Sequence, residues 1–124
     1  MANKFTLNYS QNFEITKRSP KSVRFVIFHY TGMKNENDAI KRLKDPKHKV
    51  STHFFIRYNG DIICMVPERY VAWHAGKSKW KNYSMLNKKS IGIEISNQGH
   101  GLKYTKFKEN QIKNIINLSK YLKK

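Results

Sequence analysis

The stretch Ser90–Asn97, SIGIEISN, decides the expected fold because every second residue in it is isoleucine over six positions. On an extended strand the three isoleucines lie on one face, and Glu94 lies on the other face with Gly92 and Ser96. A lone carboxylate in so apolar a strand is costly unless a cation or a hydrogen-bond donor meets it. Glu94 is therefore either a functional carboxylate or the partner of one of the many lysines.

A second strand supplies a histidine. Residues Val23–Tyr30 read VRFVIFHY and are apolar on both faces apart from Arg24, which favours a central place in the sheet. His29 lies near the end of this strand, and Tyr30 separates it from the Thr-Gly pair at 31–32. A His and a Glu delivered by two buried strands to one end of a sheet suggest a metal ion and a general base.

The rest of the pattern predicts an α/β fold with a mixed central β-sheet packed by helices. An Asn-Gly pair at 59–60 marks a hairpin turn, and Asn35 or Asn37 can cap the first helix. Residues 1–20 are expected to form a loosely packed N-terminal arm, anchored by Phe5, Leu7 and Phe13. The expected elements are strands at 23–30, 50–58, 61–66 and 90–96, helices at 35–44 and 108–122, and loops at 71–87 and 97–104.

Size and charge narrow the function classes. The 124 residues suffice for one domain with a modest core, and the formal net charge is +17. Twenty of the 25 positive residues are lysines, and they are scattered along the chain. Base readout favours arginine, so we expect a general attraction to polyanions and no specific nucleic acid. A nucleic-acid-binding protein driven by charge stays a further hypothesis, and it predicts binding that falls steeply with salt.

The N-terminus bears on location. It lacks the apolar core of a secretory signal, and no apolar run approaches the roughly 20 residues of a membrane span. The protein is therefore expected either in the cytoplasm or, if a signal was removed, in the periplasm or cell envelope. We expect a monomer.

The five histidines and the single cysteine differ in what their surroundings favour. His29 occupies a position typical of a ligand. We expect His53 to be a hydrogen-bonded core histidine and His74 to line a groove. His48 and His100 are expected at the solvated surface, and Cys64 is expected to be a small buried hydrophobe. A catalytic zinc takes three protein ligands and an open position, and these residues alone provide one convincing ligand.

Four motifs in order carry a resemblance to a known family. They are FVIFHYTG at 25–32, VSTHFFIRYNGDIICMVPE at 50–68, AWHAGKSKW at 72–80 and LNKKSIGIEISNQG at 86–99. The chain resembles the zinc-dependent N-acetylmuramoyl-L-alanine amidases of bacteria, and more distantly the phage lysozyme-type amidases and peptidoglycan-recognition proteins. The resemblance covers about Val23 to Leu122, nearly the whole chain.

The resemblance implies a role for each matching residue. His29 matches the first zinc ligand, and Glu94 matches the catalytic glutamate. Trp73 and His74 fall beside the substrate groove of the family. His53 matches a histidine that we take as structural. Some relatives have a catalytic tyrosine just before that histidine, where this chain has a threonine, so Glu94 is expected to carry the base role.

The family's other two zinc ligands, a His and an Asp or Cys, would lie beyond Lys124. We therefore expect residues 21–124 to form an amidase domain that is incomplete at its C-terminus. The implied reaction is hydrolysis, by a zinc-activated water, of the amide bond between N-acetylmuramic acid and L-alanine in peptidoglycan or muropeptides. The alternative is a non-catalytic peptidoglycan-binding module that has lost zinc ligands.

Overall fold

A five-stranded mixed sheet forms the centre of the molecule. The computed structural model describes residues 5–75, 79–80, 83–84, 86–99 and 106–123. In spatial order the strands of this sheet are β1 (Thr6–Leu7), β5 (Ile62–Cys64), β4 (Phe54–Ile56), β9 (Ser90–Ile95) and β3 (Phe25–Tyr30). Strands β3, β9 and β4 are parallel, β5 is antiparallel to β4, and β1 is parallel to β5. The expected mixed α/β architecture is therefore confirmed.

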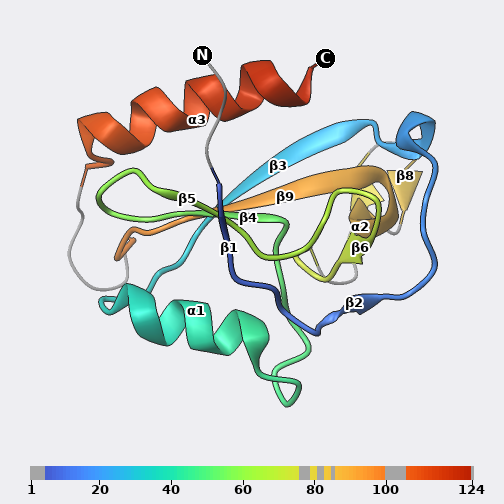
Figure 1. The fold of residues 1–124 in the computed structure, drawn as a ribbon, viewed down its shortest axis with the longest axis horizontal. Helices are drawn as coiled ribbons and strands as arrows, with labels where there is room; N and C mark the ends of the chain where they lie inside the picture. The colour runs from blue at the N-terminus through green and yellow to red at the C-terminus, as the bar shows by residue number, and fades with distance from the viewer. Residues whose placement is uncertain (1–4, 76–78, 81–82, 85, 100–105, 124) are drawn as a thin grey trace.

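One long helix covers each face of the sheet (Figure 1). Helix α3 (Glu109–Leu122) lies on one face, where Leu118 packs against the isoleucines of β9. Helix α1 (Glu36–Lys44) lies on the other face, where its Ile40 and Leu43 join a second core cluster. Both helices were predicted, and the side chain of Asn35 caps α1 by accepting from two backbone amides. The isoleucine face of β9 thus belongs to α3, and the Glu94 face belongs to the side of α1.

Strand β3 lies at the edge of this sheet, so its predicted central position is wrong. Among the described strands β3 pairs with β9 alone. Its side chains alternate between half-buried and exposed, and Val26, Phe28 and Tyr30 are 38%, 46% and 52% exposed. The prediction assumed that a strand with apolar residues on both faces is buried on both faces. In β3, three large apolar side chains remain in contact with solvent.

The N-terminal segment is more firmly held than a loose arm. Ser10 and Asn12 are buried, and the Asn12 side-chain amide donates to the carbonyls of Asp45 and Val50 at 2.9 Å each. Phe5 packs against the ring of Phe54, as an anchor should. Phe13, in β2 (Phe13–Glu14), packs against the Tyr70 ring. Leu7 is 61% exposed and is not an anchor.

The segment expected to be a loop at 71–87 contains regular structure. Strand β6 (Val71–Ala72) pairs with β2, and β7 (Lys79–Trp80) pairs with β8 (Tyr83–Ser84). A short helix, α2 (Leu86–Lys89), leads directly into β9, and a single 3-10 turn occupies Pro20–Ser22. Within the described residues, every helix is too short or too polar to cross a bilayer.

Candidate active site

His29 and Glu94 lie side by side on the sheet. They are register partners of the parallel pair β3 and β9, and neighbouring strands are about 4.8 Å apart. Paired residues point to the same face, and Phe55, the β4 partner of Glu94, belongs to the core cluster of α1. Both side chains therefore face the α1 side of the sheet. The strand pattern predicted this juxtaposition, and the structure places the two residues together.

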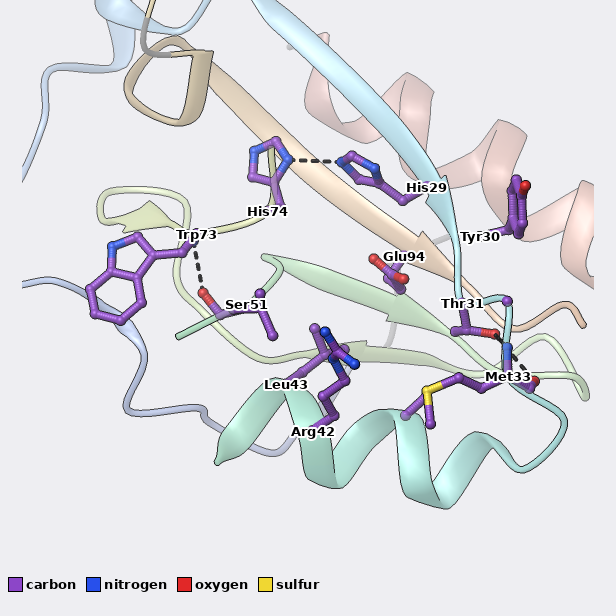
Figure 2. Close-up of a pocket in the computed structure, with 13 residues that line it drawn as sticks. His29, Tyr30, Thr31, Met33, Arg42, Leu43, Ser51, Trp73, His74 and Glu94 are labelled. Atoms are coloured by element: carbon purple, nitrogen blue, oxygen red, sulfur yellow. Dashed lines mark hydrogen bonds between the residues drawn. The ribbon is translucent and has the colours of Figure 1, made fainter. Parts of the chain in front are cut away.

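A cavity of about 440 Å³ opens above these two residues, between the sheet and α1. Figure 2 shows Glu94 near its middle, with Trp73 towards one end and Met33 towards the other. Arg42 reaches the cavity from α1. The cavity therefore brings together all four residues that the sequence assigned to the site: His29, Trp73, His74 and Glu94.

The carboxyl group of Glu94 is held in a setting that favours its protonated form. Burial raises its pKa from 4.5 to about 7, and the positive charge of Arg42 opposes this rise only in part. Burial dominates because a carboxylate loses its hydration there. A carboxyl group with a pKa near neutrality can both accept and return a proton in the physiological pH range.

A hydrogen-bonded chain runs from His29 back into the fold. His29 Nε2 lies 3.1 Å from His74 Nδ1, and His74 Nε2 lies 3.0 Å from Ser90 Oγ. Burial lowers the pKa of His29, and burial together with the nearby His53, His29 and Arg18 lowers that of His74 to about 3. Both rings are therefore neutral at pH 7. The sequence did not predict the link between His29 and His74 or the part played by Ser90.

Gly92 makes room for His74. A Cβ atom at Gly92 would lie 2.3 Å from Cγ of the His74 ring, well inside contact distance. The ring therefore lies directly over the backbone of β9, between Ser90 and Glu94. A glycine inside a strand often marks such a close approach, and this signal was available in the sequence.

His53 fixes β9 from the other side and is confirmed as a core histidine. Its ring is fully buried, and its Nδ1 accepts a hydrogen bond from the backbone amide of Gly92 at 3.0 Å. Thr52, which occupies the position of the family's tyrosine, donates from its hydroxyl to the Gly92 carbonyl at 2.8 Å. Both residues therefore support the strand that carries Glu94.

The other residues singled out in the sequence lie away from the cavity. Cys64 is buried in the core cluster of α3, and His48 is exposed beside Asp45, as predicted. His100 lies outside the described residues.

Two polar side chains hold the segment that carries Trp73 and His74. Asn87 of α2 accepts from the backbone amides of His74 and Ala75 at 3.1 and 2.7 Å. The Ser51 hydroxyl accepts from the Trp73 amide at 2.8 Å (Figure 2). Sequence reasoning missed both residues, because small polar residues in loops carry no signal of their partners.

Known proteins resemble this chain in sequence and in fold. The family model described as N-acetylmuramoyl-L-alanine amidase matches residues 19–124. The chain belongs to this family. It is 37% identical over 110 residues to the N-acetylmuramoyl-L-alanine amidase AmiD of Escherichia coli, covering 79% of this chain and 39% of AmiD. It is also 45% identical over 47 residues to the 1,6-anhydro-N-acetylmuramyl-L-alanine amidase AmpD of the same bacterium, covering 38% of this chain and 26% of AmpD.

Solved structures of the family share the fold. The AmiD structure, in complex with the substrate anhydro-N-acetylmuramic acid-L-Ala-D-γ-Glu-L-Lys, superposes with a TM-score of 0.69 at 35% identity, over 82% of this chain and 43% of AmiD. AmpDh3 of Pseudomonas aeruginosa gives a TM-score of 0.74 at 29% identity, over 96% of this chain and 51% of AmpDh3. The chain thus spans about half or less of the length of these relatives.

The amidase family implies a zinc ion, and the donor atoms of the cavity fit it in part. A catalytic zinc takes three protein ligands. Within the described residues, no group of three His, Cys, Asp or Glu side chains could hold a metal ion. His29 fits one ligand position, because its imidazole faces the cavity beside a carboxylate.

Proposed function

We propose that this chain is part of an N-acetylmuramoyl-L-alanine amidase and supplies its general base and one of its zinc ligands. The reaction is hydrolysis of the amide bond between the lactyl group of N-acetylmuramic acid and L-alanine, in peptidoglycan or muropeptides. The observation that carries the proposal is the placement of His29 and Glu94 as register partners, facing one open cavity. Family membership supports the choice of substrate class.

In this proposal Glu94 is the general base. Its carboxylate takes a proton from the attacking water, and the resulting carboxylic acid gives the proton to the leaving amine of L-alanine. The raised pKa suits both steps, because the same group must be a base first and an acid afterwards. Arg42, on the α1 side of the cavity, favours the ionised form that begins the cycle.

His29 would be one ligand of the zinc ion. At that position a zinc ion would lower the pKa of a bound water molecule and polarise the scissile carbonyl. We propose that residues 21–124 form the amidase domain and that the remaining ligands follow Lys124 in sequence. The described residues hold no three-ligand cluster, and this agrees with ligands supplied from elsewhere.

Trp73 and His74 are proposed to border the substrate. Both line the cavity, and Trp73 lies away from Glu94 towards one end. An indole there offers an apolar surface to a sugar ring or a peptide side chain. The AmiD and AmpDh3 structures with anhydromuramoyl peptides show that relatives take such molecules.

A second candidate is a non-catalytic module that binds peptidoglycan. The specific observation in its favour is again the incomplete ligand set within the described residues. This module would keep the cavity and bind muropeptides without cleaving them.

A release assay distinguishes the two functions. N-acetylmuramoyl peptides are incubated with zinc and a form of the protein that also carries the remaining proposed ligands, and free peptide is measured by chromatography and mass spectrometry. Wild-type protein is expected to release peptide, and Glu94→Gln is expected to bind substrate but release it at least about 100-fold more slowly. Glu109→Gln, which removes an exposed carboxylate on α3, is the matched control.

Full release by Glu94→Gln would remove Glu94 from the base role. Binding without release by the wild-type protein in zinc would favour the non-catalytic module.

A further inference from the structure

The hydroxyl proton of Ser90 has a single destination. Ser90 Oγ lies 2.6 Å from the Leu86 carbonyl oxygen and 3.0 Å from His74 Nε2. A carbonyl oxygen can only accept, and a hydroxyl carries one proton, so Ser90 donates to Leu86. The contact with His74 is then a hydrogen bond only if His74 Nε2 carries a proton and donates it to Ser90 Oγ.

The same reasoning extends one step towards the cavity. A neutral imidazole carries one proton, and His74 packs against two other imidazole rings, those of His29 and His53, which disfavours a second proton on its ring. With that proton on Nε2, His74 Nδ1 is a bare acceptor. His29 Nε2 lies 3.1 Å from it and must be the donor. The single proton of neutral His29 is therefore on Nε2, and its Nδ1 keeps a free lone pair.

We propose that Ser90 and His74 are positioning residues that fix the tautomer of His29, so that His29 Nδ1 faces the cavity as a metal-binding nitrogen. This inference rests on the proposed function, because it assigns which atom of His29 binds the ion. Histidine ligands of metals generally donate their second ring nitrogen to a protein acceptor, which fixes tautomer and ring orientation. In this chain the acceptor is a second imidazole, itself fixed by a main-chain carbonyl through one hydroxyl.

The surroundings of His29 agree with a free Nδ1. Within the described residues, its ring makes one hydrogen bond, to His74. The one buried side-chain polar atom found without a partner in this part of the chain is the Tyr58 hydroxyl oxygen. His29 Nδ1 is therefore not among the buried atoms without a partner, and His29 itself lines the cavity.

Ser90, where the hydrogen-bonded chain through His74 to His29 begins, is held in place by its position in the fold. Leu86 is the first residue of α2, which runs directly into β9, and Ser90 is the first residue of β9. Ser90 is fully buried, so water does not compete for its hydroxyl. Gly92 leaves the space that the His74 ring occupies. The hydrogen-bonded chain therefore depends on Leu86, Ser90 and Gly92, three positions within residues 86–92.

The tautomers can be measured directly. Long-range ¹H–¹⁵N spectra of the metal-free protein at pH 7.5 separate protonated from bare ring nitrogens. The wild-type protein is expected to show His29 and His74 both protonated on Nε2 and bare on Nδ1. A His29 ring protonated on Nδ1 would overturn the proposal without any variant.

Variants test which residues set this state. Ser90→Ala removes the acceptor of His74, so His29 is expected to populate the tautomer protonated on Nδ1. His74→Gln keeps a carbonyl acceptor for His29, so His29 is expected to keep the wild-type tautomer, protonated on Nε2. This variant provides the test if Ser90→Ala does not fold. Ser119→Ala is the matched control, because it removes another hydroxyl that donates to a carbonyl, in α3. An unchanged His29 spectrum in folded Ser90→Ala would contradict the role of Ser90.

A zinc titration followed at the His29 ring, in a form of the protein that also carries the remaining proposed ligands, separates this inference from the proposed function. Zinc is expected to perturb Nδ1 of the wild-type ring, and Ser90→Ala is expected to need about 10–100-fold more zinc. The expected tautomer with no response to zinc would overturn His29 as a ligand and leave its hydrogen bonding as described. A zinc response centred on Nε2 would overturn the proposal itself.

Discussion

The absence of a side chain at Gly92 controls the site at the scale of single residues. In Gly92→Ala the new Cβ would lie 2.3 Å from the His74 ring, so the ring must move away from Ser90 and His29. We expect a loss of about 1–3 kcal/mol in the free energy of unfolding, measured by urea denaturation, together with loss of the His29 tautomer preference.

A double-mutant cycle provides the control for Gly92. If the cost arises from the ring, Gly92→Ala should cost far less in a His74→Ala background, because the clashing atoms are gone. Equal costs in the two backgrounds would show that the strand itself, and not His74, requires glycine.

The pKa of Glu94 predicts a pH dependence of stability in the metal-free protein. The unfolded chain releases this proton near pH 4.5, whereas the folded chain holds it to about pH 7. Stability supplied by the buried neutral carboxyl is therefore complete below pH 4.5 and is lost as the pH rises to about 7. Relative to Glu94→Gln, which cannot ionise, the wild-type protein should lose about 3 kcal/mol over this window.

Urea denaturation of both proteins at pH 4 and pH 8 measures this change. Glu109→Gln, which alters an exposed carboxylate, should follow the wild-type curve. Parallel curves for wild type and Glu94→Gln would contradict the raised pKa.

Residue positions that follow from strand alternation could be predicted from the sequence, and contacts that depend on the tertiary fold could not. Alternation put Glu94 opposite the isoleucines, and the strand end identified His29. The bond between His29 and His74 joins residues 45 positions apart, and no local pattern encodes it. The same holds for Ser90, whose importance arises from two partners that meet only in the fold.

At the scale of elements, the N-terminal segment is tied to the C-terminal end of α1. Asn12 is 2% exposed and donates to the carbonyls of Asp45 and Val50. Asn12→Ala leaves these partly buried acceptors without their donor, so we expect a loss of about 1–3 kcal/mol in the free energy of unfolding. The exposed neighbour Gln11 offers the control, and Gln11→Ala should stay within about 0.5 kcal/mol of wild type.

Thermal or urea unfolding of the two variants checks this prediction. Equal, small effects would mean that residues 5–14 contribute little to the domain and act as a dispensable arm.

The long elements were predicted well, and the short or edge elements were not. Helices α1 and α3 carry caps and apolar stripes that do not depend on distant residues. Strands β1, β2 and β6 have two residues each, so they exist only through pairing. The position of β3 within the sheet depends on which strands flank it, and its own sequence does not carry that information.

At the scale of the whole molecule, the formal net charge of +17 affects every encounter. Two copies repel each other at low ionic strength, and anionic polymers are attracted. Both effects weaken as salt shortens the Debye length to about 8 Å at physiological ionic strength. The net charge therefore makes the association of the protein with other molecules depend on salt concentration, but it does not select the substrate.

The open edge of β3 has a practical consequence for handling this chain. Val26, Phe28 and Tyr30 are exposed on β3, and among the described residues no strand pairs with its outer edge. Such edges favour intermolecular sheet formation. Electrostatic repulsion keeps the protein molecules apart in low-salt buffer, and added salt screens this repulsion. Colloidal stability should therefore decline as ionic strength increases, so purification and storage favour low-salt buffers.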